Sequence, residues 1–339
     1  MGGLGLKSAE AHAAPSYLIS VALSLPLMTS ILAPTQPKID LSPSLGLLNN
    51  SVDSPIALED LQESSQKVLS HAVDSQSRRR LMESLQRTLD RARLNSLGLQ
   101  HAGDYLNAIP SRNLDLHLNL EEFRVNVQYR LGMPIFDGPG ACLACQRDND
   151  EYGDHAISCG MQGERISRHN ALRDDLHRTA ITANLSSRRE ARHLLPGVDA
   201  RPADVFIRRW IRHQDTAFDV TVINPLQQAL VDQAANNPGY ALEIAKRRKN
   251  EQSFEVCRRE NIIFIPLPVE TFGAWHPEAI PELRRIARAL ARETGKEEKS
   301  ATQHLFQRLS ISLARGNASL FLSRKPDSIP VDLVGNDFH

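Results

Sequence analysis

The sequence predicts an α/β protein with a small central sheet, and three observations support this fold class. Leucines recur at three- and four-residue spacing over much of the chain, which is typical of amphipathic helices. Three short runs rich in β-branched and aromatic residues occur at 203–210, 217–224 and 262–267. A long helical stretch separates the second run from the third, and this order of helices and strands is that of an α/β layer.

The composition is that of an ordinary globular chain. Its 339 residues leave room for two or three domains, and 41% hydrophobic with 24% charged residues excludes collagen, coiled coils, mucins and multispan membrane proteins. Forty basic residues cancel forty acidic ones, so net charge indicates no particular partner. Three of the four cysteines lie close together, which favours a metal site in a reducing compartment over a disulfide scaffold.

The first hundred residues are expected to be mainly helical. The apolar run 16–33 is interrupted by Pro26 and several hydroxyl residues, so it predicts an amphipathic or core helix rather than a membrane span or signal peptide. Residues 33–57 are rich in Pro, Ser and Asn and predict an irregular linker. Leucine spacing then predicts helices over 57–73 and 78–97.

Helices and strands alternate in the rest of the chain. A helix over 118–133 should carry Phe123, Val127 and Leu131 on one face, and one over 164–185 should bury Ile166, Leu172 and Leu176. The first two strands follow, and then a helical stretch over 226–259 that the turn Asn-Asn-Pro-Gly interrupts. After the third strand, helices are expected over 277–294 and 301–324.

Four metal-binding side chains form the most specific motif. Two residues lie between Cys142 and Cys145, nine between Cys145 and His155, and three between His155 and Cys159. Two ligands from a tight turn and two from a second short element are how a chain surrounds Zn²⁺ with a tetrahedron. Because all four positions are good ligands, the spacing predicts a closed, structural zinc site. The distant Cys257 is expected to be a small buried residue.

A second group combines two carboxylates with lysines. Asp204 begins the first strand-like run and Asp219 lies in the second, so adjacent strands would bring both to one place in a sheet. Paired carboxylates suit Mg²⁺, which can activate a water for phosphodiester hydrolysis. On the following helix Lys246 is the first candidate for a phosphate-stabilising charge and Lys249 the second. The alternative is that these are ordinary surface residues.

Arginine is concentrated between Gly160 and His213, where no lysine occurs, and a second basic group lies at 246–249. Guanidinium groups match phosphate geometry, so this pattern predicts contact with nucleic acid, although charged runs are also common on solvated faces. The candidate nucleic-acid-binding residues are Arg165, Arg168, Arg201, Arg208, Arg209, Arg247 and Arg248.

These segments together resemble the carboxyl-terminal part of non-LTR retrotransposon polyproteins, of the type with a zinc knuckle followed by a restriction-enzyme-like endonuclease. The resemblance rests on the segments CLAC…GDHAISC, SRHNALRDDLH, RPADVFI, FDVTVINPLQ, ALEIAKRRKN, IIFIPLPVETFGAW and LFQRLSISLARGNA. The opening GGLGLKSAEAHAAPSYL is similar to the end of the reverse transcriptase thumb in such polyproteins.

The resemblance implies a PD-(D/E)xK nuclease that nicks target DNA, so that a polymerase can prime from the freed 3′ end. Pro202 and Asp204 match the family's first motif with Ala203 inserted, and Asp219 matches its second acid. Thr221 stands where ordinary members have a lysine, and the retrotransposon branch uses a downstream helical lysine, best matched by Lys246. The paired-aspartate motif of a polymerase is absent from the sequence.

The chain is therefore expected to be a transposon fragment or a domesticated gene that cuts DNA. Its partners would be DNA, or RNA as an alternative, and a reverse transcriptase supplied in trans, with no membrane; its location would be nuclear or cytoplasmic, not secreted. Two rival hypotheses are a nucleic-acid-binding protein that no longer cuts and a helical interaction scaffold. The expected regions are a thumb remnant with linker (1–75), a helical linker (76–135), a CCHC zinc knuckle (136–163), the endonuclease domain (164–325) and a tail (326–339).

Overall fold

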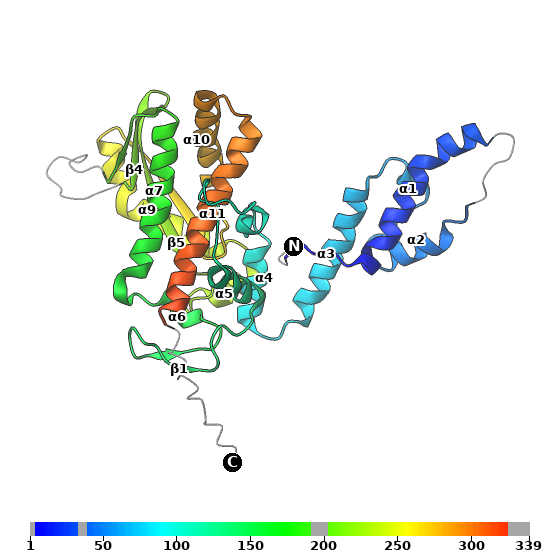
Figure 1. Ribbon diagram of the computed structural model, residues 1–339, viewed down its shortest axis with the longest axis horizontal. Coiled ribbons are helices and arrows are strands. Elements are labelled where there is room, and N and C mark those ends of the chain that lie inside the picture. The colour runs from blue at the N-terminus through cyan, green and yellow to red at the C-terminus, as the bar shows by residue number, and fades with distance from the viewer. Residues whose placement is uncertain (1–3, 33–38, 191–202, 325–339) are drawn as a thin grey trace, which may run out of the picture. The chain divides into compact units, whose positions relative to one another are not determined.

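The structure is a computed structural model that describes residues 4–32, 39–190 and 203–324. It confirms the predicted α/β class, with a small mixed sheet flanked by helices (Figure 1). The chain divides into two compact units, Met1–Arg87 and Thr88–His339. The expected boundary between residues 75 and 76 falls inside a helix, ten residues or so before this division.

The first unit is helical. It contains α1 (Ala9–Ile31), α2 (Ser42–Asn49), a short 3-10 turn and α3 (Gln66–Ser84), which share one apolar cluster. Two expectations were wrong here: α2 lies within the predicted irregular linker, and α3 runs through the predicted break between 73 and 78. Neither Gly nor Pro occurs in α3, and the Ser65 side chain caps its first turn by accepting a hydrogen bond from the Val68 amide, so nothing interrupts it.

Of the helices described, α1 alone is long and apolar enough to cross a membrane. Length and composition are weak evidence, since core helices of soluble proteins pass the same test. One side of α1 packs into the apolar cluster of the first unit through Leu18, Ile19 and Ala22.

The second unit opens with α4 (Thr88–Leu97) and α5 (Leu120–Leu131). Asn119 and Glu122 form a capping box at the start of α5, and Gly132 ends it with a left-handed φ of 67°. The predicted helix is confirmed, and its buried face differs from the apolar face that the sequence indicated. Val125 and Tyr129 are buried, whereas Phe123 and Leu131 are more than two-fifths exposed.

The sheet of the second unit has the order β3-β4-β5-β6. Strands β3 (Ser187–Arg189), β4 (Val205–Ile211) and β5 (Gln214–Ile223) form an antiparallel meander. The chain then passes through α8 (Val231–Asn236) and α9 (Tyr240–Arg259) and returns as β6 (Ile263–Glu270), parallel to β5. A helical crossover is what a parallel pair requires.

Helices cover both faces of this sheet. Alternate strand residues such as Val205, Ile207 and Phe218 pack against α7 (Glu164–Thr182), α10 (Ala279–Thr294) and α11 (Glu298–Leu322), and Figure 1 shows α11 running beside α7. The intervening Phe206 and Ala217 pack with Cys257 of α9, which confirms that Cys257 is buried.

Along α7, Leu172 and Leu176 are buried as predicted. Ile166 is 65% exposed, so its predicted burial was wrong. This leaves the first turn of α7 outside the main core, close to the cysteines.

Candidate functional site

The Cys142, Cys145, His155 and Cys159 side chains converge in a small loop region before α7. A hairpin is formed by two strands of two residues each, β1 (Gly140–Ala141) and β2 (Asp148–Asn149). The loop between them carries the first two cysteines. The short helix α6 (Asp154–Ser158) carries the histidine. The carboxylate of Asp150 accepts hydrogen bonds from the amides of Tyr152, Asp154 and His155 and so fixes the start of α6.

The four ligand atoms are spaced as a metal ion requires. They all lie within 4.8 Å of one another, with 3.9 Å between the sulfurs of Cys142 and Cys159 and 3.2 Å from Cys145 Sγ to His155 Nε2. A tetrahedron of ligands about 2.3 Å from zinc has edges of about 3.8 Å. These residues can therefore hold a zinc-sized ion in a closed Cys₃His site, with His155 bound through Nε2.

We call residues 140–159 the cysteine loop. Apolar contacts attach it to the core of the second unit. Ala156 and Ile157 are completely buried in a cluster that includes Tyr129 and Phe321. Gly153 approaches so closely that a Cβ there would lie 2.8 Å from the Phe321 ring. The metal-binding group is therefore part of this unit and is not a separate small domain.

A second group of polar side chains lies at the start of β4 and the middle of β5. Asp204, immediately before β4, accepts a hydrogen bond from the Val220 amide through Oδ2 at 2.7 Å. Asp219 points from β5 toward α9, on the face opposite Phe218 and Val220. The structure thus brings together the two aspartates that the sequence paired. Pro202 and Arg201 lie outside the described residues.

His169 of α7 completes this group, and the sequence analysis assigned it no role. Its Nε2 lies 3.0 Å from Asp204 Oδ2 and 3.0 Å from the Val220 carbonyl oxygen. Since both neighbours accept hydrogen bonds, Nε2 carries the proton. The candidate ligand atoms of His169, Asp204 and Asp219 lie within 4.8 Å of one another, so the two carboxylates are close enough to share one metal ion beside His169. The signal in the sequence was the polar run Arg-His-Asn at 168–170, in a helix whose other face is apolar.

The two candidate lysines take different positions, and the second candidate, Lys249, is the one that contacts an aspartate. Lys249 Nζ lies 2.8 Å from Asp219 Oδ2, in direct contact with the group. Lys246 Nζ lies 2.6 Å from Glu278 Oε1 instead, near the start of α10. Glu243, one turn earlier, binds His276 Nε2. Lys249 therefore reaches Asp219 from helix α9 and not from the strand that carries Thr221.

Burial and neighbouring charges shift the pKa values of the two aspartates in opposite directions. Burial raises the pKa of Asp219 to about 7, and the charge of Asp204 adds to this effect against the opposing attraction of Lys249. Burial also acts on Asp204, but the hydrogen bond and charge of His169 outweigh it and lower the Asp204 pKa. The same contact raises the pKa of His169 despite the desolvation of its ring. Asp204 is thus held charged, whereas Asp219 binds a proton more readily than an exposed aspartate does.

The predicted nucleic-acid-binding arginines fall into two classes. Arg168 is a correction: it is 4% exposed, donates a hydrogen bond to Asn317 and packs on Gly316, so a phosphate cannot reach it. Arg165 is exposed and hydrogen-bonds to the Ser158 carbonyl. The remaining described candidates are exposed, namely Arg208, Arg209, Arg247 and Arg248. Arg201 lies outside the described residues.

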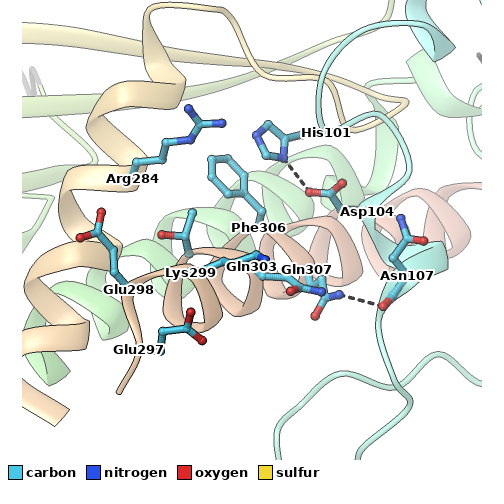
Figure 2. Close-up of a pocket in the computed structure, with 11 residues that line it drawn as sticks. His101, Asp104, Asn107, Arg284, Glu297, Glu298, Lys299, Gln303, Phe306 and Gln307 are labelled. Atoms are coloured by element: carbon cyan, nitrogen blue, oxygen red, sulfur yellow. Dashed lines mark hydrogen bonds and ion pairs between the residues drawn. The ribbon is translucent and has the colours of Figure 1, made fainter. Parts of the chain in front are cut away.

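A large cavity lies elsewhere in the second unit, and no predicted site residue lines it. It measures about 1000 Å³ between α10, α11 and the turn that begins at His101. Figure 2 shows Arg284 and His101 on either side of Phe306, with His101 Nδ1 bound to Asp104 at 2.7 Å. The His101 and Phe306 rings stack with 3.6 Å between their centroids, and both rings line the cavity.

No protein-family model matches the chain, and no curated protein matches it.

Proposed function

We propose that the chain is a Mg²⁺-dependent DNA endonuclease of retrotransposon origin. The observation that carries this proposal is the contact of Lys249 with Asp219 beside Asp204 and His169. Two carboxylates with a lysine make the combination that metal-assisted phosphodiester hydrolysis needs: ligands for the cation and a fixed positive charge for the phosphate.

The order of elements supports the restriction-endonuclease-like core that the sequence resemblance implies. Helix α7 is followed by the meander β3-β4-β5, then by α9 and the parallel strand β6. In this order the first acid begins the middle strand of the meander and the second lies on its neighbour. The same arrangement explains how a lysine from α9 substitutes for the missing strand lysine at Thr221, since α9 packs directly on β5 and β6.

Each side chain has a distinct role in the proposed reaction. Asp204 and Asp219 would hold Mg²⁺, which when bound neutralises a phosphate oxygen and lowers the pKa of a bound water. His169 keeps Asp204 ionised and in place through its Nε2 proton. The Lys249 ammonium lies close enough to Asp219 to contact a phosphate oxygen or orient the attacking water. Lys246 lies against Glu278 and takes no part in the chemistry.

The Cys₃His group is proposed to be a zinc knuckle with a structural role. Purified protein should contain close to one zinc per chain, and Cys142→Ser or His155→Ala should lose it, measured by elemental analysis. Because such sites supply much of the folding free energy of a small loop region, both variants should become sensitive to protease around residues 136–163. A zinc-free protein with that region intact would contradict the assignment.

The nuclease is tested by plasmid nicking with zinc-loaded protein. Mg²⁺ should be omitted in the control and not removed by a chelator, since a chelator would also take the zinc. Nicking that appears with Mg²⁺ and not with Ca²⁺ supports the proposal. Binding of DNA under both conditions without nicking under either would support the alternative, a nucleic-acid-binding zinc-knuckle protein of transposon origin that no longer cuts.

A further inference from the structure

The hairpin between β4 and β5 contains an irregularity that displays arginines. Ile207 pairs with Thr216 and Ile211 with Gln214, so four steps along β4 are matched by two along β5. The additional residues on β4 form a bulge at Arg208 and Arg209, and Arg209 has a left-handed φ of 51°. Bulges turn side chains out of the regular pattern of a strand, and here both arginines are exposed.

Two further exposed arginines lie near this bulge. Arg188 lies on the edge strand β3, opposite Phe206, and Arg212 lies in the turn of the hairpin. Within the described part of the chain, no ion pair joins the guanidinium groups of Arg188, Arg208, Arg209 or Arg212 to a carboxylate. The neighbouring Arg189, by contrast, pairs with Asp174. We call these four residues the basic edge.

A hollow at the end of the hairpin extends the basic edge. It measures about 400 Å³ and is lined by Trp210, Arg212 and Arg285, with Ile211, Gln214 and Ile263. The indole nitrogen of Trp210 is held by Glu282 at 3.3 Å, which fixes the ring beside the hollow. A guanidinium next to an aromatic face on an open surface suits a phosphate and its sugar.

The basic edge leads away from the candidate active site. Five strand positions separate Asp219 from Gln214, which is about 17 Å at 3.3 to 3.4 Å per residue. The turn at Arg212 lies slightly farther, at roughly 20 Å. With about 3.4 Å per base pair along one strand of B-DNA, this corresponds to about five or six base pairs.

We propose that the basic edge binds the sugar-phosphate backbone of duplex DNA on one side of the cut, with its far end at Arg212 about five or six base pairs from the scissile phosphate. This inference rests on the proposed function, because it measures the distance from the aspartates that would cut. The chemistry favours a duplex over an acidic peptide: the four exposed cations lie on two neighbouring strands and their turn, and within the described residues none of their guanidinium groups is paired with a carboxylate. The contact gives binding and register without reading sequence.

The test compares two triple variants of the full chain. Arg208→Gln, Arg209→Gln and Arg212→Gln remove three charges of the basic edge. Arg112→Gln, Arg124→Gln and Arg292→Gln remove three exposed charges elsewhere. Affinity is measured in Ca²⁺ with DNA duplexes that contain one nick. The duplex arms on the two sides of the nick are shortened one base pair at a time. For wild type, the affinity should drop when one arm becomes shorter than about five base pairs.

The basic-edge variant should bind long and shortened arms equally, and its log–log salt slope should be flatter than wild type by about two to three units. The control variant should keep both the length dependence and the slope of wild type. Equal behaviour of the two variants would overturn the proposal, as would a preference for duplex RNA that depends on the basic edge. Because binding is read in Ca²⁺, this result is independent of nicking. A chain that shows the length dependence and never nicks refutes the endonuclease alone.

Discussion

Lys246 and Lys249 lie one turn apart on α9, and their surroundings differ completely. Lys249 contacts Asp219 and Lys246 contacts Glu278. If the aspartates carry the chemistry, Lys249→Ala should slow nicking by roughly 10²- to 10³-fold, in line with the loss of one preorganised charge. Lys246→Ala is the matched control and should change the single-turnover rate less than about threefold. The reverse order would return the catalytic role to Lys246.

Glu270 at the end of β6 gives the folded chain a pH dependence of its own. It is 1% exposed, its Oε2 finds no hydrogen-bond partner among the described residues, and burial raises its pKa to about 7 against a bond from Ser96. Since the folded state binds this proton more tightly than the unfolded state, stability is full at low pH and falls as the pH rises through about 4 to 7.

Glu270→Gln cannot ionise and should remove this loss. Its Tm, followed by the fluorescence of Trp210 and Trp275 in the second unit, should exceed that of wild type above about pH 7 and approach it below about pH 4. Glu293→Gln replaces an exposed carboxylate and should show no such gap. A pH-independent difference between Glu270→Gln and wild type would mean that packing, not ionisation, decides the effect.

Sequence reasoning at single residues succeeded where a motif constrained several positions together. The spacing of the cysteines and of the aspartates placed each group in one site. It failed where the answer depended on how a helix is rotated against its neighbours. Positions three apart on a helix diverge by about 60°, so only the packing of α9 decides between Lys246 and Lys249. Arg168 was misjudged for the same reason, because α11 covers it.

At the scale of elements, two glycines cap the starts of α6, within the cysteine loop, and α7, directly after it. Gly153 precedes α6 with φ 80°, and Gly163 precedes α7 with φ 86°. Alanine at either position carries the strain of a left-handed backbone, about 1 kcal/mol. At Gly153 a Cβ would also meet Phe321 at 2.8 Å, whereas at Gly163 it meets open space.

Gly153→Ala should therefore destabilise the second unit by about 1 to 3 kcal/mol more than Gly163→Ala does. Urea unfolding followed by tryptophan fluorescence measures the difference, and weaker zinc retention should accompany it because α6 carries His155. Equal losses at the two positions would show that the cysteine loop is not held against Phe321 in solution.

The elements that the sequence predicted well are those with strong periodicity or strong β-propensity. The strands β4, β5 and β6 and the helices α7 and α9 to α11 lie where leucine spacing and β-branched runs put them, within a few residues. The edge strand β3 was missed because it has only three residues, Ser187–Arg189. These residues are polar and mostly exposed. Such a strand exists only because β4 offers it a partner, and no local pattern reveals that.

At the scale of the whole molecule, the fold class was predictable and the division into units was less so. Each apolar cluster is made within one unit, and the cysteine loop shares its cluster with α4, α5 and α11. The sequence placed α4 and α5 in a linker, because amphipathic spacing shows that a helix has a buried face but not which element covers it. These helices are structural parts of the unit that contains both candidate sites.

The central claim is that Asp204 and Asp219 form one metal-dependent cutting site. The most direct measurement is single-turnover nicking of a supercoiled plasmid in Mg²⁺ by zinc-loaded wild type, Asp204→Asn and Asp219→Asn, with DNA affinity measured in parallel in Ca²⁺. Both variants should lose nicking, while their affinity for DNA stays the same or increases, since each removes a negative charge facing the phosphates. Equal nicking by wild type and Asp219→Asn would contradict the account.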